Sequence, residues 1–125
     1  MQKTMLVIAG VFALVICASA DTSIYQGYVY DNYQGSWHKT DTATVWSSAP
    51  NSNSTMTPCG GCDHGYYSIP AYPAPSAGTY WVKASKTIGG NAYGSCGWFY
   101  YNGENTTFGA DLYMTHPATN CPEQR

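Results

Sequence analysis

Apolar and polar residues alternate along most of this chain, and this alternation constrains the fold more than any other feature. In the segment 79–85, Tyr80 and Val82 alternate with Trp81 and Lys83. Successive side chains of a β-strand point to opposite faces, so a period of two predicts a half-buried strand. No window of useful length has the 3.6-residue period of an amphipathic helix.

Six segments share this strand pattern and are separated by turn-forming residues: 24–31, 42–48, 66–69, 79–85, 92–101 and 106–115. Their predicted inward residues are Tyr25, Gly27 and Val29, then Ala43 and Val45, then Tyr80, Val82 and Ala84. The polar stretch 49–64 is expected to be a long loop. Short strands at this spacing predict an all-β fold, a single small antiparallel β-sandwich of about seven strands.

The first twenty residues have a different pattern. Lys3 precedes an unbroken apolar run over 5–17, and the small residues Ala-Ser-Ala follow at 18–20. This order is typical of a secretory signal peptide. The apolar run is also short of the roughly 20 residues that a membrane-spanning helix needs. We therefore expect cleavage after Ala20 and a mature domain over 21–125 that is secreted or held at the cell surface.

Four cysteines belong to the predicted mature domain, namely Cys59, Cys62, Cys96 and Cys121. An even number of cysteines in a small exported domain predicts disulfides, and four of them allow three connectivities. We favour a pairing in which Cys59 and Cys62 diverge toward Cys96 and Cys121. That pairing would pin both the long loop and the C-terminal segment.

The Cys59-Gly-Gly-Cys62 segment also has the spacing of thiol–disulfide oxidoreductases, and with His64 and either Cys96 or His116 it has the residue types of a zinc site. Redox catalysis needs a helix N-terminus to lower the pKa of the first thiol, whereas a turn into a strand is predicted after Cys62. Oxidising conditions and the lack of a second CxxC disfavour zinc. Both remain alternatives, and we predict no metal and no cofactor.

No catalytic constellation is recognisable. The three histidines are isolated from one another in the sequence, and no serine lies in a Gly-x-Ser-x-Gly elbow. We therefore do not expect an enzyme. Without Lys3 the chain has four basic residues against seven acidic ones and no basic cluster. Nucleic acid is thus a poor partner, and no membrane association is expected after signal cleavage.

Aromatic residues take the place of aliphatic ones, with 12 tyrosines and 4 tryptophans. A tyrosine-rich core follows, since each ring buries roughly 150–250 Å². The strand phase places Trp46 and Trp81 outward, and Tyr28 and Tyr30 with them. Outward rings stack on sugars or bury a partner protein, whereas covered sheet faces would make them core. An extracellular protein, a polysaccharide or self-assembly through strand edges are the partners considered.

Two N-glycosylation sequons begin at Asn53 and Asn105. Both lie in predicted loops, where a glycan is accepted.

Four segments carry a family pattern: Gly27-x-Val29-x-Asp31, Ala43-x-Val45, Asp63-x-Gly65-Tyr66-Tyr67 and Ala77-Gly78-Thr79-Tyr80-x-Val82. In this order and spacing they resemble the carboxypeptidase regulatory-like domain of the transthyretin-like (prealbumin-type) β-sandwiches, over residues 24 to about 115. The resemblance implies a β-sandwich that serves as a non-catalytic accessory or surface module, and it implies no substrate.

Several features of the chain differ from the family pattern and limit the function that the resemblance implies. The long loop and the four cysteines are not part of the pattern, and the first strand lacks the lysine of relatives with Lys–Asn isopeptide bonds. The C-terminus also lacks the Tyr-Arg-Gly-Ser tail of the purine-pathway hydrolases. The predicted function is a secreted, non-catalytic structural, surface or binding module. A carbohydrate-binding module and a CxxC redox or zinc protein are the alternatives.

Overall fold

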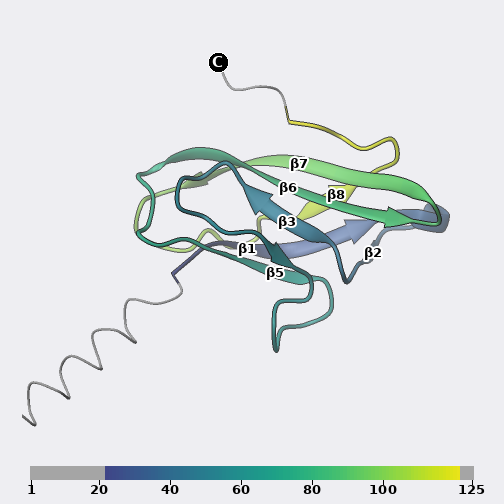
Figure 1. Ribbon diagram of the computed structural model, residues 1–125, viewed down its shortest axis with the longest axis horizontal. Coiled ribbons are helices and arrows are strands. Elements are labelled where there is room, and N and C mark those ends of the chain that lie inside the picture. The colour runs from purple at the N-terminus through teal and green to yellow at the C-terminus, as the bar shows by residue number, and fades with distance from the viewer. Residues whose placement is uncertain (1–21, 122–125) are drawn as a thin grey trace, which may run out of the picture.

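The protein is a two-sheet, all-β structure, as predicted, in a computed structural model that describes residues 22–121 (Figure 1). The first sheet has the order β2-β1-β5, with β8 on β1, and comprises β1 (Ser23–Asp31), β2 (His38–Lys39), β5 (Tyr66–Pro70) and β8 (Leu112–Met114). The second has the order β4-β3-β6-β7 and comprises β3 (Thr44–Ser47), β4 (Thr55–Met56), β6 (Gly78–Ile88) and β7 (Asn91–Tyr101). A short 3-10 turn, η1 (Tyr33–Gly35), precedes β2.

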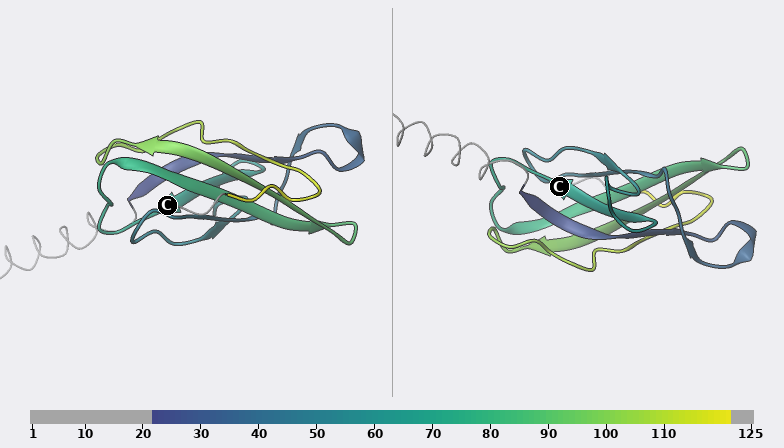
Figure 2. Two further views of the ribbon diagram at one scale, coloured as in Figure 1. Left: turned by 90° about the horizontal axis from the view of Figure 1, so that it is seen from above. Right: turned by 90° about the horizontal axis from the view of Figure 1, so that it is seen from below.

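The β6–β7 hairpin forms most of the second sheet and extends along the length of the molecule (Figures 1 and 2). Its turn is the pair Gly89–Gly90, with φ of 57° and 84°, a backbone region that glycine adopts readily. The turn pairs Ile88 with Asn91 and so fixes the register of all the other residue pairs between β6 and β7.

The core lies between the two sheets and is rich in tyrosine. Tyr25, Tyr67 and Tyr101 are fully buried, and the predicted inward residues of β1 and of the segment 43–45 are buried with them. Val82 and Ala84 of β6 are buried as predicted, with Tyr80 half-buried. The Tyr25 hydroxyl donates to the Phe99 carbonyl at 2.8 Å, a contact between the two sheets. Burial raises the pKa of Tyr25 to about 12, so this donor stays protonated well above the ordinary tyrosine pKa of 10.

The favoured disulfide pairing was wrong. Cys59 pairs with Cys62, and Cys96 pairs with Cys121. The first bridge is local because the Cys62 N–H donates to the Cys59 carbonyl at 2.8 Å and closes a tight turn. The second is long-range, because the C-terminal segment returns to β7.

Two segments depart from their predicted form. The polar stretch 49–64 contains β4, which pairs with β3, as well as a bridge between Ser52 and Ala71. Its two-residue polar strand has too little alternation to be recognised in the sequence. The predicted strand 106–115 is broken into a bridge at Thr107 and β8. Both parts lie parallel to β1, the exception to an otherwise antiparallel arrangement.

The break in this last strand has a local cause. Gly109 has a φ of 76°, which turns the chain out of the strand conformation. The Asp111 side chain then accepts the Tyr28 N–H at 2.8 Å, where a backbone carbonyl would accept it in a regular ladder. The alternation in the sequence predicts a strand here, but it does not reveal that a side-chain carboxylate takes the place of a backbone acceptor.

The predicted signal peptide, residues 1–20, lies outside the described residues. Within 22–121 no helix has the length and apolar character needed to cross a membrane.

A substitution at Gly27 tests how closely residues 110–111 pack on β1. A Cβ at Gly27 would lie 2.6 Å from the carbonyl carbon of Ala110 and 2.9 Å from Oδ1 of Asp111. Gly27→Ala is therefore expected to lower the free energy of unfolding by about 1–3 kcal/mol, because backbone has to move. Chemical denaturation measures the change. Gly60→Ala, which has no heavy atom within 4 Å of the added carbon, is the matched control. Equal effects of the two substitutions would contradict this packing.

Candidate functional site

The four aromatic residues predicted to face outward lie on opposite sides of the molecule. Trp46 and Trp81 belong to β3 and β6 of the second sheet, whereas Tyr28 and Tyr30 belong to β1 of the first. The two sheets pack through their inner faces, so their outer faces point away from each other. The structure thus presents two aromatic surfaces.

Trp46, Trp81, Lys83 and Trp98 define the tryptophan face. Trp81 of β6 is paired directly with Trp98 of β7, and Trp46 of β3 is paired directly with Lys83 of β6. Trp81 and Lys83 are two residues apart on the same side of their strand. Three neighbouring strands therefore contribute an indole each to one continuous surface. Trp46 and Trp81 are half-buried and Trp98 is 39% exposed.

Lys83 is held against the rings of this face. Its Nζ lies 5.2 Å from the centroid of the Trp81 ring and 5.7 Å from that of Trp46. Both distances are within the range of cation–π attraction. The ammonium group is thus placed between two indoles that come from different strands.

A groove continues the tryptophan face toward the β2–β3 end of the sheet. Its volume is about 500 Å³, and it is lined by Thr42, Thr44, Ser85, Lys86, Thr87, Ala92 and Tyr93. Thr44 and Ser85 are paired with each other, and each lies two residues from a member of the Trp46–Lys83 pair. Indoles, an ammonium group and hydroxyls therefore follow one another along the same sheet face.

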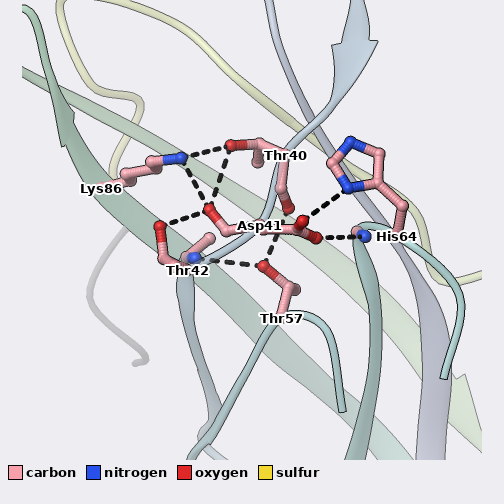
Figure 3. Close-up of polar contacts among 8 residues, drawn as sticks. Thr40, Asp41, Thr42, Thr57, His64 and Lys86 are labelled. Carbon is pink, nitrogen blue, oxygen red and sulfur yellow. Dashed lines mark hydrogen bonds and ion pairs between the residues drawn. The ribbon is translucent and has the colours of Figure 1, made fainter. Parts of the chain in front are cut away.

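A polar network supports the turn at the end of this groove (Figure 3). The Lys86 ammonium donates to Thr40 Oγ1 at 2.8 Å and to the Asp41 carbonyl at 2.6 Å. Buried Thr57 donates to the Thr40 carbonyl at 2.8 Å and accepts the Ala43 N–H at 3.0 Å. These contacts join β6, the β2–β3 turn and the segment after β4. They hold the turn that carries the groove residue Thr42.

Asp41 ties the same turn to the loop before β5. Its carboxylate accepts the Gly65 N–H at 2.8 Å and contacts His64 Nδ1 at 2.6 Å (Figure 3). The Gly65 N–H, and then the hydrogen bond and charge of His64, lower the pKa of Asp41 below its ordinary value of 3.8. His64 and Asp41 are 23 residues apart in sequence, which is why the sequence pattern did not reveal the pair.

The C-terminal segment borders the tryptophan face. Thr115 pairs with Gly94 at the free edge of β7, and a Cβ at Gly94 would lie 2.9 Å from the Ala118 side chain. The Cys96–Cys121 bridge then anchors the segment on β7, and Cys96 is paired directly with Lys83. The disulfide thus has a position beside the candidate site.

The tyrosine face on the other sheet consists of Tyr28, Tyr30, Trp37, Tyr66 and Tyr113. The rings of Tyr30 and Tyr113 are stacked at 4.7 Å, and those of Tyr28 and Tyr66 meet edge to face at 5.0 Å. Trp37 packs edge-on to Tyr113 at 5.2 Å. These rings pack mainly on one another.

Sequence reasoning missed the exposed rings of Trp98, Trp37 and Tyr113, which belong to the two aromatic faces. A signal for Trp98 was present in the Gly89–Gly90 pair, because a two-residue turn there sets the register that places Trp98 opposite Trp81. Trp37 and Tyr113 had no comparable signal. Tyr113 reaches Tyr30 through the parallel β1–β8 pairing, which local sequence does not specify.

The remaining predicted site residues are placed as follows. Asn53 and Asn105 are both exposed, in the positions expected of glycan acceptors. His38 contacts the buried Asp31 carboxylate at 2.9 Å. The Cys59–Cys62 bridge is followed by β5, and no helix begins at either cysteine. Within the described part of the chain, no three His, Cys, Asp or Glu side chains are grouped closely enough to hold a metal ion.

Comparison with known proteins adds no relative. No family model matches the chain, and no curated protein or solved structure matches it. The resemblance to carboxypeptidase regulatory-like domains therefore stays a prediction.

The lowered pKa of Asp41 predicts a pH dependence of stability. A carboxyl whose pKa is lower in the folded state stabilises the fold above the unfolded pKa and loses this contribution as pH falls through the folded pKa. Asp41→Asn should therefore reduce the free energy of unfolding at neutral pH. The difference from the parent chain should shrink as pH falls below 3.8. Urea unfolding over a pH series measures both effects.

His64→Gln is the control for the source of this effect. The Gly65 N–H is the leading cause of the lowered pKa, so this variant should keep most of the depression in an NMR titration of Asp41. A parent chain and Asp41→Asn variant that differ equally at every pH would contradict the assignment.

Proposed function

We propose that this chain is an exported, non-catalytic β-sandwich module that binds carbohydrate on its tryptophan face. The observation that carries the proposal is the contiguity of three indoles from adjacent strands with a hydroxyl-lined groove on one sheet face. The predicted signal peptide and the two disulfides support export, because disulfides persist in oxidising compartments.

The chemistry of the face suits a sugar. The C–H groups on one side of a pyranose ring are apolar and weakly positive, and the face of an aromatic ring is negative. An indole thus attracts the flat side of a sugar, while protein hydroxyls exchange hydrogen bonds with the sugar hydroxyls. Thr44 and Ser85 place such hydroxyls directly beside Trp46 and Lys83. A groove of about 500 Å³ is within the usual size range of ligand sites.

The tyrosine face supports a second candidate function, the binding of a partner protein. Trp37 is 47% exposed and Tyr113 is 49% exposed, next to rings that are already packed together. Aromatic residues are enriched in the cores of protein interfaces.

Paired substitutions distinguish the two faces. Trp81→Ala with Trp98→Ala should weaken glycan binding about tenfold or more, since a stacked ring contributes roughly 1 kcal/mol and 1.4 kcal/mol corresponds to a factor of ten. Trp37→Ala with Tyr113→Ala is the matched control on the opposite face and should leave glycan binding unchanged. A glycan array followed by calorimetry on the bound sugars measures both, with thermal unfolding to verify the fold. Binding that survives loss of the indoles would refute the proposal.

A further inference from the structure

We infer that the tryptophan face selects saccharides that carry a carboxylate, the uronic acids, and that Lys83 is the residue that receives this group. The inference rests on the proposed carbohydrate binding and adds the class of sugar. It follows from the charge and the hydrogen-bonding state of Lys83 and from its position between the indoles.

Lys83 differs in its hydrogen bonding from the other lysines of the described residues. Of the lysines in the described residues, Lys86 donates to Thr40 and to the Asp41 carbonyl, and Lys39 lies over the Tyr28 ring on the opposite sheet. Lys83 contacts the indole rings, and no acceptor among residues 22–121 takes a hydrogen bond from its ammonium group. A bound ligand therefore finds an ammonium group whose protons are available.

Within the described part of the chain no carboxylate neutralises this ammonium group. The only ion pairs there are His38–Asp31 and His64–Asp41. The strands β3, β6 and β7 contain no acidic residue at all. The described acidic residues lie at other places in the chain, namely Asp31, Asp41, Asp63, Glu104 and Asp111. Among residues 22–121 the tryptophan face thus has one positive charge without a carboxylate partner.

The position of Lys83 places its positive charge beside the indoles on which a sugar would stack. Along β6 it is two residues from Trp81, a separation of about 7 Å in a strand, and across the sheet it is paired with Trp46. Its ammonium lies 5.2 Å from one indole centroid and 5.7 Å from the other. A carboxylate on a sugar bound at these indoles therefore comes close enough to the ammonium for a charge-assisted hydrogen bond.

A uronic acid fits this surface better than a densely sulfated sugar does. The tryptophan face itself has one cation, Lys83, because the Lys86 ammonium of the adjoining groove donates to Thr40 and to the Asp41 carbonyl, and one carboxylate per sugar ring matches this single charge. The chain has a net charge of −2, which repels a ligand with several negative charges on each ring.

The test compares two ligands that differ only in the carboxyl group. A uronic acid oligomer and its carboxyl-reduced, neutral counterpart of the same linkage are titrated into the purified chain by calorimetry. The acidic oligomer is expected to bind about tenfold more tightly at low ionic strength, and the preference should decline with added salt. Lys83→Met keeps the apolar stem against the indoles and should remove the preference. Lys83→Arg, which keeps the charge, should retain most of it.

Lys39→Met is the matched control, because it removes a cation–π lysine from the opposite face. One outcome would overturn the role of Lys83 and leave carbohydrate binding intact. In it both oligomers bind equally, Lys83→Met does not change their binding, and the chain with Trp81→Ala and Trp98→Ala loses it. Binding of neither oligomer, nor of any other glycan, would overturn both. An acidic preference that Lys39→Met removes would place the site on the tyrosine face and overturn the inference.

Discussion

The close contact between Gly27 and residues 110–111 is the constraint on which the rest of the architecture depends. The absence of a side chain at Gly27 lets the backbone at Ala110 lie against β1. The buried Tyr67 hydroxyl donates to the Ala110 carbonyl, and the Asp111 carboxylate accepts the Tyr28 N–H. These contacts fix the returning chain on the edge of β1, and β8 can then pair with β1 in parallel.

The same return joins the two sheets. After β8, Thr115 pairs with Gly94 on the edge of β7, and Cys121 is bonded to Cys96. The segment that begins on the first sheet therefore ends on the second, and the bridge closes a loop of 25 residues that contains the whole return. A loop of this size is one whose closure stabilises a small domain by about 3 kcal/mol. The core, with its few aliphatic side chains, benefits from such a covalent link.

The aromatic side chains on the outer faces of the two sheets differ in arrangement. On the tyrosine face the rings stack and meet edge to face, while Trp37 and Tyr113 stay about half exposed. On the tryptophan face the indoles lie side by side on neighbouring strands, around one lysine and next to a hydroxyl-lined groove. The exposed Trp98 ring and the hydroxyl-lined groove beside the indoles are the features that support the proposed carbohydrate site. The polar network around Asp41 and Lys86 keeps the end of that groove in place.

The period of two in the sequence was enough to predict the all-β class, the buried faces of β1 and β6, and the outward phase of Trp46 and Trp81, because side-chain direction in a strand is a local property. The disulfide pairing, the Asp41–His64 contact and the separation of the tryptophan and tyrosine faces depended on tertiary structure. Each of these three features depends on the order of the strands in the sheets and on the path of the chain between the strands. Alternation shows which way a side chain points and carries no information on which strand lies beside it. That neighbour was decided by packing, at Gly27, at the Gly89–Gly90 turn and at the return of the C-terminal segment to β7.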